Sequence, residues 1–282
     1  MSDPLAGTDP LEALEPVVEP SGDRPGRRVA LVLAPVVGVL LFFGFWEGAV
    51  RFFDVRHFVL PTPSSIVTHM AEDPAYYVRN GQTTVWEAFL GFTLALVLAL
   101  ACATVMAHSR FVERAVLPLA VLVQVTPIIA YAPAIVIWLG FGLRPILVIS
   151  SLVCFVPFLV NAVTGFRSID PATHELLRSV DASRREVFFR LRVPHSLPYL
   201  FSAARIAVGL ALIGAVLGEF FAGSTQGLGH SVKQAQANGL RQVDQLWGNI
   251  FALALVGVVA MLLISGVERV VLRWHSSQTT GR

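Results

Sequence analysis

The chain has 282 residues, of which 55% are hydrophobic and 14% are charged. With a mean hydropathy of +0.67, it would expose far more apolar surface than a soluble domain of this size can bury, which excludes a soluble globular fold. The net charge of +2 is small, so the distribution of charge matters more than its sum. The composition predicts an all-α, polytopic membrane protein that is surrounded by the lipid bilayer and has no nucleic-acid partner.

Residues 1–28 are predicted to form a disordered tail. They contain five prolines and six acidic residues with almost no aliphatic cluster, and such a composition cannot offset its ordering entropy by burial. The acidic residues come first and no small-residue cleavage site follows a short apolar core, so we expect no signal peptide here.

Six apolar stretches of membrane-spanning length follow the tail. They cover about residues 29–50, 85–107, 116–139, 145–166, 197–222 and 248–271. An even number of spans places both termini on one side of the membrane. Fourteen of the 21 basic residues lie in the tail, the 108–115 turn, the 167–194 segment and the C-terminus, and six lie in the opposite connections. The positive-inside rule therefore predicts that both termini and the 167–194 segment are cytoplasmic.

Polar side chains inside the spans are candidates for a translocation path, because hydrocarbon retains such groups only where they pair or line a path. Gln124 and Thr126 lie beside Pro127 in the third span, and Tyr131 follows about one turn later. Asn161 is a similar residue in the fourth span. A helix kink whose polar groups are satisfied by neighbouring helices explains these residues equally well, so both interpretations stay open.

A polar, Arg-rich insert, residues 170–194, separates the fourth span from the fifth. Asp170 can cap a first short helix that begins with a proline. In that helix, Leu176, Leu177 and Val180 share one face at three- and four-residue spacing. The first half of the insert is therefore predicted to be an amphipathic helix.

The second half of the insert is predicted to be another short helix after a turn at Asp181-Ala182. Ser183 and Glu186 have the S-x-x-E spacing of a capping box just before an apolar run, so this helix should begin at Ser183. Pro194 and Pro198 are expected to end it.

The fifth span carries a lone carboxylate, Glu219, near its predicted outer end, where it is a candidate for the path or its external gate. Arg205 lies fourteen residues earlier, about 21 Å along the helix, which is too far for a direct pair. Gly214 and Gly218 form a G-x-x-x-G face that allows close helix approach. This face suits a dimer interface and packing within one subunit equally well.

No catalytic, cofactor or metal motif is visible. The sole lysine, Lys233, follows Val232, so no phosphate-binding loop of the G-x-x-x-x-G-K-[ST] type exists. His174 begins a stretch like H-E-x-x-H, but Arg178 stands where the second zinc ligand must be. We also find no G-x-S-x-G motif, and no pair of intramembrane carboxylates suggests acid–base work. The chain is therefore not predicted to be an enzyme.

The insert resembles a loop of bacterial importer permeases of the ATP-binding-cassette (ABC) superfamily. Their loop has the pattern E-A-A, three residues, G and, further on, hydrophobic-x-L-P. This chain has Glu175-Leu176-Leu177, then Asp181 in place of the glycine, then Val193-Pro194. Two leucines replace the alanines. Asp also tolerates the left-handed backbone of such a turn, although less readily than Gly, so the turn is expected to persist.

Other stretches extend the resemblance to residues 58–274. They are Leu60–Ser64 (LPTPS), Gln124–Pro127, Trp138–Gly142, Gly218–Phe220 and Gly227–Gly229. They are similar to permeases of the nitrate, sulfonate, taurine, bicarbonate and pyrimidine-precursor group. Residues 161–168 and 198–205 lean toward the pyrimidine-precursor branch.

The resemblance implies a type I importer permease in the bacterial inner membrane. Residues 29–274 would be a six-helix permease domain, and residues 275–282 a cytoplasmic tail. Two copies of the chain would form the path, a periplasmic or lipid-anchored binding protein would deliver the solute, and two copies of a separate ATPase, which holds the ATP and Mg, would grip the insert. The ATPase-coupling residues would be Glu175, Leu176, Leu177, Arg178, Val180, Asp181, Ala182 and Ser183.

An ion-gradient-driven secondary transporter is the alternative. Such carriers often show an internal repeat, which we do not find between the first and last three spans, and they have no need of an amphipathic cytoplasmic hairpin. A membrane enzyme is a more distant alternative, because no catalytic motif is present.

Overall fold

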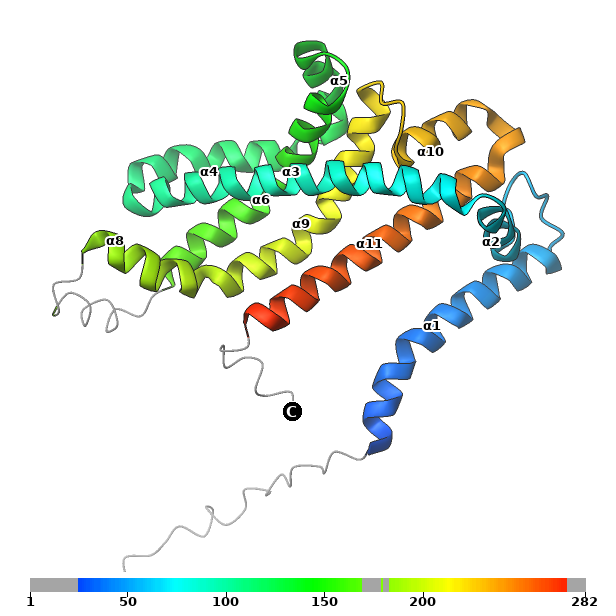
Figure 1. The fold of residues 1–282 in the computed structure, drawn as a ribbon, viewed down its shortest axis with the longest axis horizontal. Helices are drawn as coiled ribbons and strands as arrows, with labels where there is room; N and C mark the ends of the chain where they lie inside the picture. The colour runs from blue at the N-terminus through cyan, green and yellow to red at the C-terminus, as the bar shows by residue number, and fades with distance from the viewer. Residues whose placement is uncertain (1–24, 169–178, 180–182, 273–282) are drawn as a thin grey trace, which may run out of the picture. The chain divides into compact units, whose positions relative to one another are not determined.

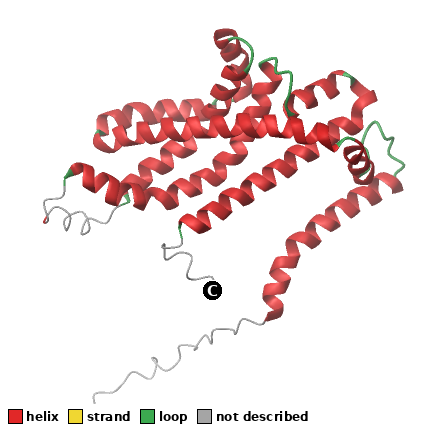
Figure 2. Cartoon of the chain, viewed as in Figure 1, coloured by secondary structure: helices red, strands yellow, loops and turns green. Residues whose placement is uncertain are grey.

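The computed structural model describes residues 25–168, 179 and 183–272. All regular structure in these ranges is helical (Figure 2). The chain divides into two compact units after Val55. The first contains α1 (Pro25–Phe52). The second contains α2 (Pro63–Glu72), α3 (Pro74–His108), α4 (Arg110–Val125), α5 (Ile128–Leu139), α6 (Leu143–Arg167), α8 (Arg184–Val187), the π-helical turn η2 (Phe188–Arg192), α9 (Val193–Phe221), α10 (Leu228–Ala237), η3 (Gly239–Gln242) and α11 (Val243–Val271).

Several helices are long and apolar enough to cross a membrane. Among the described residues they are Leu33–Phe52 of α1, α3, α6, Phe188–Phe221 of η2 and α9, and α11. The expectation of an all-α, polytopic membrane protein is thereby confirmed. A sixth crossing is present if α4 and α5 together make one span.

The third predicted span, 116–139, is not one continuous helix. α4 ends at Val125, α5 begins at Ile128, and their axes differ by 103°. The break falls at Thr126 and Pro127. The Thr126 hydroxyl donates to the Leu122 carbonyl at 2.8 Å, and Pro127 has no N–H for a helical bond. The local chemistry therefore produces a sharper bend than an apolar run alone indicates.

Several helices begin earlier than the sequence indicates, and the difference is largest for α3. α3 starts at Pro74, eleven residues before the predicted boundary (85 − 74 = 11). The Asp73 carboxylate caps it by accepting the Tyr76 N–H at 3.1 Å, and Pro74 occupies the first turn, where its missing N–H costs nothing. α1 starts at Pro25, inside the tail predicted for residues 1–28.

Small residues form the contacts among α3, α6 and α9, which lie side by side (Figure 1). A Cβ atom on Gly214 would lie 2.5 Å from the Ser150 Cα, and one on Gly218 would lie 2.8 Å from the Ile146 Cα. The G-x-x-x-G face of α9 thus packs on α6 of the same chain. Of the two interpretations left open, the described residues show packing within one subunit.

The helix bundle of the second unit has two ends. We call the end where α3 and α6 begin, α9 ends and α10 is located the "α10 end". We call the other end, where α3 and α6 end and α9 begins, the "insert end". Arg205 of α9 forms a two-pronged ion pair with Glu268 of α11, with Nε to Oε2 at 2.6 Å. Arg167 of α6 pairs with Glu113 of α4 at the insert end. These ion pairs hold neighbouring helices together where the alanine-rich core provides few interlocking side chains.

Candidate functional site

Three of the four candidate polar residues in the third and fourth spans, Thr126, Tyr131 and Asn161, hydrogen-bond within their own spans. Gln124 and Thr126 are exposed at the break between α4 and α5. The Tyr131 hydroxyl donates to the Val123 carbonyl at 3.3 Å, and Asn161 donates to a carbonyl one turn earlier at 2.9 Å. Both side chains are half-buried. The structure thus places none of the four in hydrogen-bond contact with Glu219 among the described residues, and their role in a path stays a proposal.

Glu219 is fully buried at the α10 end of the bundle, with none of its surface exposed. Its Oε1 accepts the Thr84 hydroxyl of α3 at 2.6 Å, and its Oε2 accepts the His230 N–H of α10 at 3.0 Å. The Gly229 N–H also donates to this carboxylate. A carboxylate with three donors is well satisfied without water, and Glu219 joins three helices.

The loop between α9 and α10, residues 222–227, is held on α3 by the same group of side chains. Asn80 accepts the Gly227 N–H at 3.0 Å, and Thr84 accepts the Leu228 N–H at 2.8 Å. Both residues point from one face of α3, one helical turn apart. We call Asn80, Thr84, Glu87 and Glu219 the "α10-end polar cluster".

Glycine is required at the start of α10 because the backbone runs directly over the Glu219 carboxylate. Gly227 has φ = 112°, and a Cβ there would lie 2.3 Å from the Glu219 Oε2. A Cβ on Gly229 would lie 2.8 Å from the Val216 carbonyl oxygen. The Gly227–Gly229 motif, noted in the sequence only as a resemblance, therefore lets backbone N–H groups approach a buried acid.

The sequence reveals no pair of intramembrane carboxylates, but the structure brings two of them together. Glu87 of α3 is 6% exposed, and its side chain is in hydrogen-bond contact with Glu219. Asn80, Thr84 and Glu87 were all missed in the sequence. The available signal was their three- and four-residue spacing, but the predicted span began at residue 85 and left Asn80 and Thr84 outside it.

The second half of the insert begins as the sequence predicts. Glu186 accepts the Ser183 N–H at 3.0 Å, and the Ser183 Oγ accepts the Glu186 N–H at 3.2 Å, which is the reciprocal pattern of a capping box. The Ser183 N–H and hydroxyl lower the pKa of the Glu186 carboxyl. Of the predicted ATPase-coupling residues, only Ser183 is described. The others, Glu175, Leu176, Leu177, Arg178, Val180, Asp181 and Ala182, lie outside the described residues.

Pro194 and Pro198 were expected to end this helix, but they do not. The chain passes from α8 through η2 into α9, and both prolines lie within α9. Pro194 is tolerated because it occupies the first turn of α9, after the wider π-helical turn has changed the hydrogen-bond pattern. The insert is therefore joined to α9 by continuous helical backbone.

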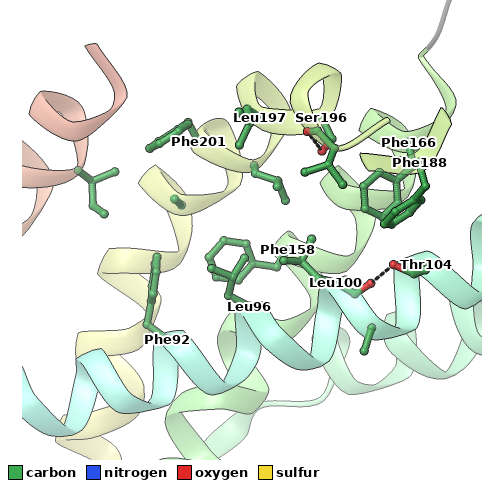
Figure 3. A pocket seen from close by; sticks show the side chains of 15 residues that line it. Phe92, Leu96, Leu100, Thr104, Phe158, Phe166, Phe188, Ser196, Leu197 and Phe201 are labelled. Atoms are coloured by element: carbon green, nitrogen blue, oxygen red, sulfur yellow. Dashed lines mark hydrogen bonds between the residues drawn. The ribbon is translucent and has the colours of Figure 1, made fainter. Parts of the chain in front are cut away.

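An apolar cavity of about 500 Å³ lies at the insert end, between α3, α6, η2, α9 and α11 (Figure 3). Its walls include the phenylalanines Phe92, Phe158, Phe166, Phe188 and Phe201. The hydroxyls of Thr104 and Ser196 at its edge donate to the carbonyls of Leu100 and Val193 on their own helices. The walls of the cavity are thus almost entirely apolar. The cavity lies where the π-helical turn meets the core of the bundle.

Replacing Gly227 by Ala should destabilise the chain more than the same change at Gly239. Gly239 has φ = 63°, a left-handed conformation that costs an alanine about 1–2 kcal/mol, whereas Gly227 has φ = 112° and ψ = 156°, a conformation adopted essentially by glycine alone. Only at Gly227 does the new methyl group also collide with the Glu219 carboxylate, whereas nothing lies within 4 Å at Gly239. Thermal unfolding of the purified variants should show a clearly lower Tm for Gly227→Ala. Equal Tm values would mean that the loop does not need its observed position on Glu219.

Comparisons with known proteins identify the family that this chain resembles. The family described as "Binding-protein-dependent transport system inner membrane component" matches residues 91–277. The formylaminopyrimidine transport permease protein ThiX of Halalkalibacterium halodurans is 31% identical over 255 residues, which cover 89% of this chain and 100% of that protein. The riboflavin transport system permease protein RibX of Chloroflexus aurantiacus is 32% identical over 243 residues, covering 86% and 90%.

Among solved structures, the fold is similar to a chain of the inward-facing MetNI methionine ABC transporter. The TM-score is 0.61 at 18% sequence identity, over 70% of this chain and 96% of the other. At this identity, the similarity concerns the fold alone.

Proposed function

Because this chain belongs to the family of binding-protein-dependent transport system inner membrane components, we propose that it is the permease subunit that forms the translocation path of an ATP-driven importer. The observation that carries this proposal is the extent of the family match. It runs from residue 91 to residue 277 and so includes the whole insert, 170–194, together with the helices on either side of it.

The insert is the proposed contact with the ATPase. The continuous helical backbone from α8 through η2 into α9 supports this, because a force applied to the insert would move α9 and, through Glu219, the α10 end. Two ATPase copies, holding ATP and Mg, would act on two permease copies, and their closure would rock the permease between inward- and outward-facing states. The distribution of basic residues supports a cytoplasmic insert and cytoplasmic termini, with 29–274 as the permease domain.

The solute is proposed to be a small organic nutrient of the pyrimidine-precursor type, delivered by a separate binding protein. The names of the two relatives, a formylaminopyrimidine and a riboflavin permease, support this choice. Gln124, Thr126, Tyr131, Asn161 and Glu219 are the proposed path or gate residues. The exposure of Gln124 and Thr126 at the break between α4 and α5 is compatible with a surface that a second copy covers.

Reconstitution separates the two classes of transporter. Vesicles that contain this chain and its ATPase should take up the solute only when ATP is present on the insert side and the loaded binding protein is on the α10 side. A proton or sodium gradient across vesicles without ATP should drive no uptake. Gradient-driven uptake by the chain alone would instead establish a secondary transporter.

A further inference from the structure

Glu87 and Glu219 form a pair of carboxyl groups that has no hydrogen-bond donor when both groups are ionised. The two carboxyl groups come from different helices, are 6% and 0% exposed, and are in hydrogen-bond contact with each other. Two ionised carboxylates have four acceptor oxygens and no donor, so such a contact is repulsive unless one group carries a proton. Their burial removes the water that would otherwise screen the repulsion.

The surrounding donors are divided unequally between the two acids. Glu219 accepts the Thr84 hydroxyl and the backbone N–H groups of Gly229 and His230. Among the described residues, the Glu87 Oε2 is buried and meets no N–H or O–H donor. Hydrogen bonds favour the charged form of Glu219, and nothing comparable favours the charged form of Glu87.

Other ionisable side chains near this end do not compensate the pair. The elements packed here bring Arg144 at the start of α6, His230 and Lys233 on α10 and Asp244 on α11. Lys233 donates to the Phe220 carbonyl, and Asp244 pairs with His57. In the described part of the chain, none of these side chains is hydrogen-bonded or ion-paired to either acid.

We infer that Glu87 is a neutral acid that donates its O–H to an ionised Glu219, so that the chain binds one proton between α3 and α9. This proton completes the α10-end polar cluster. With it, the contact between the two carboxyl groups has a donor; without it, two adjacent negative charges would push α3 and α9 apart beneath the α9–α10 loop. Separation of the loop from α3 would admit water and release the proton, which makes the pair a proton-sensitive latch. The inference does not depend on the identity of the solute or on the ATPase.

Infrared spectroscopy of the full chain in lipid nanodiscs detects the proton directly. The wild-type protein should show the carbonyl stretch of a protonated carboxylic acid at neutral pH, with a shift in D₂O. Glu87→Gln should abolish the band because the amide replaces the acid O–H with an N–H donor. Glu268→Gln is the matched control: Glu268 is also 6% exposed, but it is paired with Arg205, so its removal should leave the band unchanged.

Thermal unfolding against pH provides a second readout. An ordinary glutamic acid ionises above about pH 4.3 in an unfolded chain, so unfolding would release the Glu87 proton and wild-type stability would fall as pH rises from there. One proton corresponds to a tenfold change in the unfolding equilibrium per pH unit, and Glu87→Gln should lack this part of the slope. The inference is overturned if the wild-type protein shows no acid band, or if Glu87→Gln retains both the band and the wild-type slope.

Discussion

Replacing Leu176 and Leu177 together by Ser should release the ATPase when the assembled transporter is extracted into detergent. The two leucines and Val180 form one apolar face of a predicted short helix, and grooves of partner proteins receive such faces through anchors at this spacing. Burying two leucines contributes roughly 3–6 kcal/mol before ordering and association costs are subtracted. Its loss should reduce co-purification by a large factor, while the permease itself remains folded in the membrane.

Asp181→Gly is the matched control for this result. It changes the same insert, but it restores the glycine that related permeases have at the turn, so co-purification should stay at the wild-type level. A double-serine variant that co-purifies as well as Asp181→Gly would show that the leucine face is not the docking surface.

Removing the charge of Glu219 is expected to have the second large effect. Glu219→Gln keeps the shape of the side chain, but its neutral amide is a weaker acceptor for the Thr84 hydroxyl and the His230 N–H. Hydrogen bonds to charged groups contribute about 1.5–3 kcal/mol, compared with about 0.5–1.5 kcal/mol for neutral ones. The loop over the α10 end should therefore be held less firmly, and solute uptake by reconstituted vesicles should fall while the dimer persists.

Glu47→Gln provides the comparison for Glu219. Glu47 is a carboxylate in α1 that pairs with Arg51 one turn away. Its substitution should leave uptake close to the wild-type rate. If Glu219→Gln also transports at that rate, the proposed gate role of Glu219 is wrong and the residue only packs the helices together.

Local features of the sequence predicted local structure well. The sequence predicted the capping box at Ser183 and the apolar stretches of α6 and α11, and all three are present in the structure. Each depends on residues within a few positions of one another. The early start of α3 was missed because polar residues such as Asn80 and Thr84 look external until the partner that satisfies them is known. Their partner is the backbone at the start of α10, about 145 residues away.

The pairing of Glu87 with Glu219 could not be predicted for the same reason. The two residues are 132 positions apart (219 − 87 = 132), and each alone resembles an isolated carboxylate near a membrane interface. Their contact depends on how closely α3 and α9 both pack against α6, which Gly91, Gly214 and Gly218 allow only in the folded bundle. The continuation of α9 through Pro194 was likewise hidden, since a π-helical turn has no simple sequence signal.

The insert is proposed to couple this permease to ATP hydrolysis in a partner. The most direct test is the rate of ATP hydrolysis by the complete transporter in vesicles, measured with and without the loaded binding protein. Wild type and Asp181→Gly should both be stimulated by the loaded binding protein. The Leu176→Ser/Leu177→Ser variant should show no stimulation even when ATPase is supplied in excess. Full stimulation of the double-serine variant would contradict the assignment of residues 170–194 as the coupling element.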